Sequence, residues 1–312
     1  DSPERGDRGG TMASTEYETI TALLAASPVT PASTMEEIRD VVDGLAVLVP
    51  PGEGTRTAEV DAGGVGALWV AVDADPASDD GESPVVLHFH GGGYVMAGPH
   101  THVALLGRLI SASGGRSLSV DYRLAPEHPF PAAADDALTV YRWLLDQGVA
   151  AGRIVVAGDS AGGGLALGLL VAARDAGLPQ PAGALLLSPW VDLTGSGATM
   201  LTNAGSDAVL GPLVAQHWAT LYAGDHLADP AASPLFADLA GLAPITIQVG
   251  SREILLDDAV RLTERLVAAG VEATLAVWDD LSHWWQLFTG LVPEADQAVD
   301  ELGAFAKRVT AG

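Results

Sequence analysis

The stretch that decides the fold is Ile154-Val-Val-Ala-Gly-Asp-Ser-Ala-Gly-Gly-Gly-Leu-Ala-Leu167, in which an apolar run leads into a G-x-S-x-G sequence around Ser160. A β-branched strand, this turn and a helix of small residues form the setting of a nucleophile elbow, which presents a serine at the end of a strand. Glycines let the strand and helix backbones approach closely, and N–H groups at the start of a helix favour developing negative charge. The stretch predicts a reactive serine at Ser160. A glycine-rich turn without catalytic function is the alternative, so the assignment depends on partners elsewhere in the chain.

Strand and helix patterns alternate on both sides of this stretch. Short apolar runs predict buried strands, and the segments between them have helical spacing, as in residues 131–147 and 255–266. The expected strands are residues 44–50, 67–72, 85–90, 117–120, 154–157, 184–188, 245–249 and 273–277. This alternation indicates an α/β fold with a mostly parallel central sheet and helices on both faces.

Two regions interrupt the alternation and are expected to form a helical cap. Residues 17–26 and 35–42 have helical spacing, and no strand is expected between Leu193 and Leu239. Loops of that length are usually functional, and an ordinary surface insertion is the alternative. The predicted organisation is an N-terminal segment with cap helices, a first part of the core, a cap insertion and a second part of the core, at residues 1–45, 46–194, 195–225 and 226–312.

The composition of the 312 residues predicts a compact globular protein, because 48% are hydrophobic and 18% are charged. The net charge of −25 argues against nucleic acid or an anionic membrane surface as a partner. No stretch approaches the roughly 18 uninterrupted apolar residues that indicate a membrane span. The absence of cysteine excludes a disulfide framework, a cysteine nucleophile and thiolate metal sites.

The first ten residues are polar and glycine-rich and lack the apolar region of a secretory signal. Met12 is therefore a candidate for the natural start, and a cytoplasmic location is expected.

The general base is expected at His283. In the α/β-hydrolase scaffold the catalytic residues follow the chain order serine, acid, histidine. His283 is the histidine that follows every candidate acid, and it comes after a short loop from the strand that ends near Trp278. A half-buried histidine beside Trp284 and Trp285 is the alternative, but the elbow and the chain order together favour the catalytic role.

The acid is expected at Glu253, just past the end of the strand at residues 245–249. It must accept the imidazole Nδ1–H and hold the ring in the right tautomer. Asp257 and Asp258 have the position of first-turn helix carboxylates instead. Asp257 remains the alternative acid.

An oxyanion hole needs preorganised N–H donors. One donor is expected from Ala161, the residue after the nucleophile, and the others from the loop His90-Gly-Gly-Gly-Tyr94, which follows a buried strand. A merely flexible glycine loop is the alternative.

Five motifs together make the chain resemble the hormone-sensitive-lipase-like family of α/β hydrolases, the bacterial group called family IV esterases. The motifs are His90–Gly93, Asp121–Ala132, Gly158–Gly163, Ser188–Leu193 and Glu253–Asp257, and they place the resemblance over about residues 40–310. The resemblance implies that Gly91, Gly92 and Ala161 form the oxyanion hole. The family usually has aspartate at the position of Glu253, which keeps Asp257 open as the acid.

Other polar and aromatic residues are assigned around this site. Tyr94, Trp218 and Trp284 are expected to line the substrate pocket, with the protein core as the alternative. The pairs His88/His90 and His100/His102 have no acid near them in sequence, so neither a metal nor a cofactor is expected. The carboxylates expected to hold loops around the elbow are Glu127, Asp159 and Asp192.

The function expected from these residues is that of a serine carboxylesterase acting on short- to medium-chain esters through an acyl-enzyme with a Ser-His-Glu triad. The partner is a small-molecule ester, and a homodimer is compatible with the sequence. A lactone or amide hydrolase would share these residues. A lyase on the same fold would form no acyl-enzyme, and a ligand receptor on the same fold would need no catalytic base.

Overall fold

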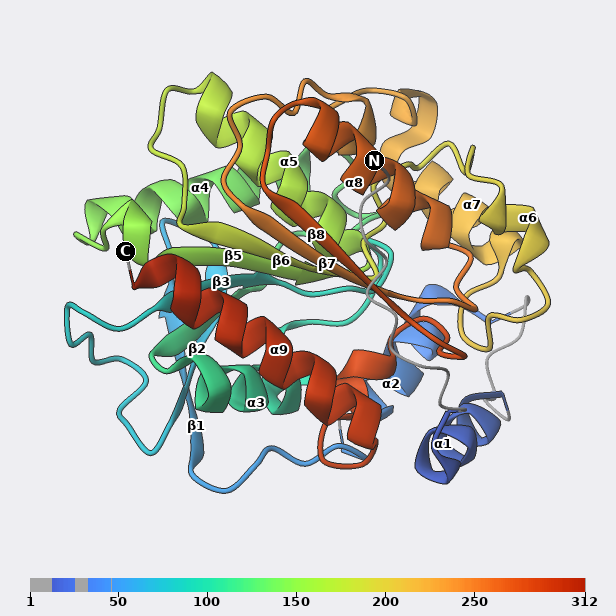
Figure 1. The fold of residues 1–312 in the computed structure, drawn as a ribbon, viewed down its shortest axis with the longest axis horizontal. Coiled ribbons are helices and arrows are strands. Elements are labelled where there is room, and N and C mark those ends of the chain that lie inside the picture. The colour runs from blue at the N-terminus through green and yellow to red at the C-terminus, as the bar shows by residue number, and fades with distance from the viewer. Residues whose placement is uncertain (1–12, 26–32, 46, 312) are drawn as a thin grey trace.

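The computed structural model describes residues 13–25, 33–45 and 47–311 (Figure 1). The expectations for the first ten residues and for Met12 lie outside the described residues.

An eight-stranded sheet forms the centre of the molecule, in the order β1-β2-β4-β3-β5-β6-β7-β8. The strands are β1 (Thr55–Asp61), β2 (Gly66–Val72), β3 (Val85–Phe89), β4 (Arg116–Val120), β5 (Ile154–Asp159), β6 (Gly183–Leu187), β7 (Ile245–Gly250) and β8 (Ala273–Trp278). Strand β2 is antiparallel to both of its neighbours, and all the other pairs are parallel. Strands β3 to β6 are buried along their whole length. Apolar residues make up most of β3, β5 and β6, as strands covered on both faces require, whereas β4 also buries Arg116, Ser117 and Ser119.

Helices cover both faces of the sheet, with α3 and α9 on one face and α4, α5 and α8 on the other (Figure 1). The helices are α1 (Thr15–Ala25), α2 (Met35–Leu45), α3 (Val103–Ser113), α4 (Ala132–Asp146), α5 (Ala161–Asp175), α6 (Thr199–Thr202), α7 (Pro212–Ala223), α8 (Leu256–Ala268) and α9 (Pro293–Thr310). Short 3-10 helices lie at Pro99–His102, Ala151–Arg153, Gly224–His226, Pro234–Phe236 and Trp285–Phe288. The predicted α/β architecture is confirmed.

The prediction of a strand at residues 44–50 is wrong. Helix α2 continues to Leu45, and residues 47–50 form no strand, with Val47 81% exposed. Among the described residues the first strand is β1, at the edge of the sheet, where half-buried positions are separated by one or two exposed ones. An edge strand that contributes one face to the core can be largely polar, so β1 has no apolar run that would reveal it.

Helices α1, α2, α6 and α7 gather at one end of the molecule, on the right in Figure 1. Arg39 of α2 donates hydrogen bonds to the carbonyl oxygens of Val95 and Ala125, at 2.8 and 3.0 Å, and pairs with Glu127 at 2.8 Å. Because Val95 closely follows the glycine loop, α2 is fastened to the segment that was expected to carry the oxyanion hole. None of the described helices is long and apolar enough to span a lipid bilayer.

Candidate active site

Ser160 lies at the tight turn between β5 and α5. Its backbone has φ +55° and ψ −121°, a conformation that is strained for any residue except glycine. A side chain at Gly158 would clash with the backbone of Gly162, and one at Gly162 would clash with the backbone of Phe89. The two glycines therefore allow the strand and helix to approach closely enough to make the turn.

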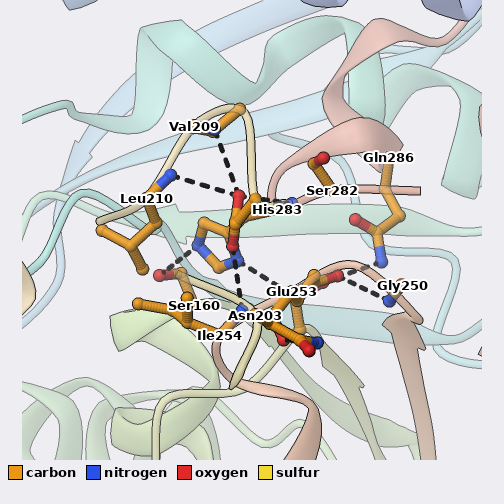
Figure 2. Close-up of polar contacts among 12 residues, drawn as sticks. Ser160, Asn203, Val209, Leu210, Gly250, Glu253, Ile254, Ser282, His283 and Gln286 are labelled. Atoms are coloured by element: carbon orange, nitrogen blue, oxygen red, sulfur yellow. Dashed lines mark hydrogen bonds and ion pairs between the residues drawn. The ribbon is translucent and has the colours of Figure 1, made fainter. Parts of the chain in front are cut away.

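His283 and Glu253 complete a hydrogen-bonded series with Ser160 (Figure 2). The Ser160 Oγ lies 2.8 Å from His283 Nε2, and His283 Nδ1 lies 2.9 Å from Glu253 Oε2. Ser160 and His283 are each 3% exposed, and Glu253 is fully buried. The structure thus brings together the three residues that the sequence predicted as nucleophile, base and acid.

The second oxygen of Glu253 is held by two donors. Glu253 Oε1 accepts hydrogen bonds from the Gly250 N–H and from the Ser188 hydroxyl, both at 2.6 Å. Ser188 has a positive φ of +46°, and the Gln286 side-chain amide donates to its hydroxyl at 3.4 Å. These contacts turn the Glu253 carboxylate toward His283. The contact of Ser188 with the acid was not predicted from the sequence, although Ser188 opens one of the five motifs.

Asp257, the alternative acid, does not lie beside the imidazole of His283. Asp257 accepts a hydrogen bond from the Thr199 N–H at 3.2 Å, and Asp258 accepts from the N–H groups of Val191 and Asp192, both at 3.0 Å. Neither carboxylate contacts His283 within the part of the chain that the structure describes. The geometry therefore favours Glu253 as the partner of the imidazole.

The pKa of His283 is raised above the usual value of a histidine. Burial lowers this pKa, but the hydrogen bond and charge of Glu253, with the charges of Asp207 and Asp159, raise it further than burial lowers it. The neutral imidazole, which alone can accept a proton, is therefore lost as the pH falls through this raised pKa.

In the glycine loop, one of the N–H groups predicted as oxyanion donors is already hydrogen-bonded to a carboxylate. The Gly91 N–H donates to Asp159 Oδ1 at 3.0 Å and is therefore not free for a substrate oxygen. Among the hydrogen bonds of residues 47–311, none uses the N–H of Gly92, Gly93 or Ala161. Gly92 and Gly93 have φ of +108° and +61°, which turn successive amides of this loop. The available donors are thus Gly92, Gly93 and Ala161. The sequence could not distinguish three adjacent glycines.

Comparisons with known proteins agree with this geometry. Residues 86–287 match the α/β hydrolase fold family. The chain is 41% identical over 263 residues to an acetyl-hydrolase of Streptomyces hygroscopicus, with 84% of each chain covered. It is 35% identical over 271 residues to an esterase of Acinetobacter venetianus, covering 86% of this chain and 88% of the relative.

A solved structure of an esterase from the bacterial hormone-sensitive lipase family superimposes with a TM-score of 0.91 at 40% identity, covering 96% of this chain and all of that one. The chain belongs to this family of α/β hydrolases. The predicted resemblance is confirmed, and with it the enzyme class, a carboxylic ester hydrolase.

Two of the three aromatic residues predicted for the substrate pocket of this hydrolase pack against the glycine loop. A side chain on Gly93 would lie 2.5 Å from the Trp218 ring, and one on Gly91 would lie 2.9 Å from Trp284 Nε1. Tyr94 is 1% exposed and stacks face to face on Tyr222, with ring centres 3.8 Å apart. Trp218 and Trp284 therefore lie beside the loop, while Tyr94 belongs to an aromatic stack.

A buried polar cluster lies beneath the glycine loop of the hydrolase. His88 and His102 each place Nε2 near Asp159 Oδ1, at 3.5 and 3.0 Å. Burial raises the pKa of Asp159, but the two histidines lower it further, to well below its usual range. One ligand atom from each of the three residues lies within 4.8 Å of the others, a geometry that could hold a metal ion.

No acid lies near these histidines in the sequence, because Asp159 comes from β5, the strand that precedes the nucleophile and pairs with β3. The predicted loop-holding role of Asp159 agrees with its hydrogen bond from Gly91. Glu127 and Asp192 likewise hold loops through Arg39 and Arg261, at 2.8 and 2.9 Å.

Proposed function

We propose that this hydrolase is a serine carboxylesterase that works through an acyl-enzyme, with Ser160 as nucleophile, His283 as general base and Glu253 as the orienting acid. The observation that carries the proposal is the continuous series of contacts from Ser160 Oγ through the imidazole to Glu253, at 2.8 and 2.9 Å. A ligand receptor would have no need of a base at hydrogen-bond distance from a serine hydroxyl.

In the first half of the reaction, Ser160 Oγ attacks the ester carbonyl carbon while His283 Nε2 takes the hydroxyl proton. Glu253 accepts the Nδ1–H, which leaves Nε2 free to accept that proton, and its charge stabilises the imidazolium. The carbonyl oxygen becomes an oxyanion bound by the available N–H donors, Gly92, Gly93 and Ala161. Cleavage of the C–O bond then releases the alcohol, which takes the proton from His283 and leaves the acyl group on Ser160.

In the second half, a water molecule replaces the alcohol. His283 removes a proton from the water as its oxygen attacks the acyl carbon, and the same oxyanion donors bind the second tetrahedral intermediate. Collapse breaks the bond to Ser160, which recovers its proton from the imidazole, and the carboxylic acid leaves.

The substrates proposed are small esters with short to medium acyl chains. The aromatic side chains of Trp218 and Trp284 lie against the glycine loop, close enough that a side chain on Gly93 or Gly91 would meet them. Helices α1, α2, α6 and α7 are proposed as the cap over this region. The homodimer and the cytoplasmic location stay predictions.

A panel of p-nitrophenyl esters from acetate to palmitate tests the substrate class. We expect kcat/KM to peak at about four to eight acyl carbons and to fall for longer chains, because bulky aromatic walls limit the length that fits. Activity that rises steadily to palmitate, with activation at a lipid interface, would instead indicate a lipase. If the protein hydrolysed none of these esters, the proposed function itself would be wrong.

A further inference from the structure

The carboxylate of Asp207, between α6 and α7, accepts hydrogen bonds from backbone N–H groups of three separate loops. Its Oδ1 accepts from Val209 and Leu210, at 3.1 and 3.2 Å, and from the N–H of His283 itself at 3.4 Å. Its Oδ2 accepts from Ile254, the residue after Glu253, at 3.0 Å. Dashed lines in Figure 2 mark these bonds around His283.

The hydrogen bonds from Val209 and Leu210 are those that an aspartate in a turn commonly accepts. Asp side chains commonly accept hydrogen bonds from N–H groups two or three residues further on, which stabilises a turn. The bonds from Ile254 and His283 have no part in that turn, because they come from segments 47 and 76 positions away. They connect the loop that contains Asp207 to the two loops that carry the acid and the base.

Neighbouring contacts reinforce this connection. The side-chain amide of Asn203 donates to the carbonyl oxygens of Ser251 and Glu253, at 3.1 and 2.9 Å. The N–H of Ala208 donates to the Ser282 hydroxyl at 3.2 Å. Residues 203–210 are thus hydrogen-bonded both to the segment that carries Glu253 and to the segment that carries His283.

Asp207 also contributes negative charge near the imidazole. The charged groups that face His283 are Glu253, Asp207 and Asp159, and each favours the protonated ring. Tyr17 packs against the same loop, and its hydroxyl accepts a hydrogen bond from the Ser282 N–H at 2.5 Å. Burial raises the pKa of Tyr17 above its usual value, so this phenol stays uncharged where the esterase would work.

We propose that Asp207 is a positioning residue of the triad, which fixes the backbone of His283 and of the residue after Glu253 and stabilises the imidazolium by its charge. This role rests on the proposed function, because it requires His283 to take up a proton during the reaction. With this role, the segment 195–225 would help to position the triad in addition to covering the substrate as part of the proposed cap.

The substitution Asp207→Asn tests both parts of the role. Asparagine retains an oxygen that can accept from Val209 and Leu210, but its amide nitrogen would face the N–H of Ile254, and the charge is lost. We expect kcat for p-nitrophenyl acetate to fall roughly tenfold or more, because small displacements of catalytic groups have effects of this size. KM should change little.

The pH profile separates positioning from simple structural support. Removing a negative charge lowers the pKa of His283, so the acidic limb of kcat/KM should move to lower pH in Asp207→Asn. A merely structural role would lower the melting temperature without moving that limb. A folded variant with the wild-type kcat or the wild-type acidic limb would overturn the proposal.

Two further variants complete the experiment. Asp207→Glu keeps the charge but alters its reach, so we expect a reduced kcat with the acidic limb near that of the wild type. Asp280→Asn is the matched control, since it removes an exposed carboxylate from the loop that leads to His283, where Asp280 pairs with Arg252 at 2.9 Å. We expect it to keep the wild-type kcat and pH profile.

The outcomes distinguish this role from the proposed function. If Asp207→Asn does not fold, Asp207→Glu decides, and a wild-type kcat in that variant overturns the role. Should Ser160→Ala remain active, the proposed triad fails whatever Asp207 does. If Ser160→Ala is inactive while the Asp207 variants behave as the wild type, only the role of Asp207 is lost.

Discussion

Replacing Ser160 with alanine is expected to lower kcat for p-nitrophenyl esters on the order of 10⁴-fold or more, the cost of removing a triad nucleophile. In the proposed mechanism the hydroxyl attacks the ester, and within the described part of the chain its side-chain hydrogen bond is with His283 Nε2 at 2.8 Å. The strained backbone at Ser160 is held by its surroundings, since its N–H donates to Leu187 O at 2.9 Å and its carbonyl accepts from Trp190. Alanine can keep both backbone bonds, so the variant should fold.

The measurement combines steady-state kinetics with circular dichroism and a melting curve. Ser111→Ala is a suitable control, because the Ser111 hydroxyl donates to Gly107 O within α3, at 2.9 Å, and no bond among the described residues links it to the triad. We expect the control to keep its activity. A Ser160→Ala variant that retains more than a few per cent of the wild-type rate would show that another residue is the nucleophile.

The features that the sequence predicted well are those encoded by neighbouring residues or by chain order. The elbow around Ser160 depends on a strand, a turn and a helix that are contiguous in the chain, so a single stretch reveals it. The contact of His283 with Ser160 could be anticipated because the order of serine, acid and histidine left one histidine after the candidate acids. Buried strands such as β5 and β6 were visible because apolar runs are needed where both faces of a strand are covered.

The features that were missed depend on residues brought together only by folding. Three adjacent glycines are equivalent in sequence, and only the position of Asp159 shows that the Gly91 N–H is already used. Asp207 belongs to no motif, and its partners Ile254 and His283 lie far along the chain. The edge strand β1 was missed for a related reason, since its pairing with β2 compensates for a polar sequence.

The second large effect is expected at Glu253, in a comparison of Glu253→Gln with Asp257→Asn. In Glu253→Gln the amide oxygen is expected to keep the bonds from the Gly250 N–H and the Ser188 hydroxyl, both at 2.6 Å in the wild type. The amide nitrogen then faces His283 Nδ1 as a donor. This favours the tautomer with the proton on Nε2, which cannot accept the proton of Ser160. In a comparable triad the wrong tautomer costs about 10⁴-fold in kcat.

Asp257→Asn should behave differently, because Asp257 contacts the Thr199 N–H on the helix side of the loop and not the imidazole. A carboxylate in the first turn of a helix contributes about 0.3–1 kcal/mol to stability and nothing direct to the reaction. We therefore expect Glu253→Gln to be folded and nearly inactive, and Asp257→Asn to keep most of its kcat with a slightly lower melting temperature. The reverse pattern would mean that the triad acid is Asp257, in the first turn of α8. Equal and severe losses would mean that both carboxylates orient the imidazole, and a single-acid triad would then be the wrong description.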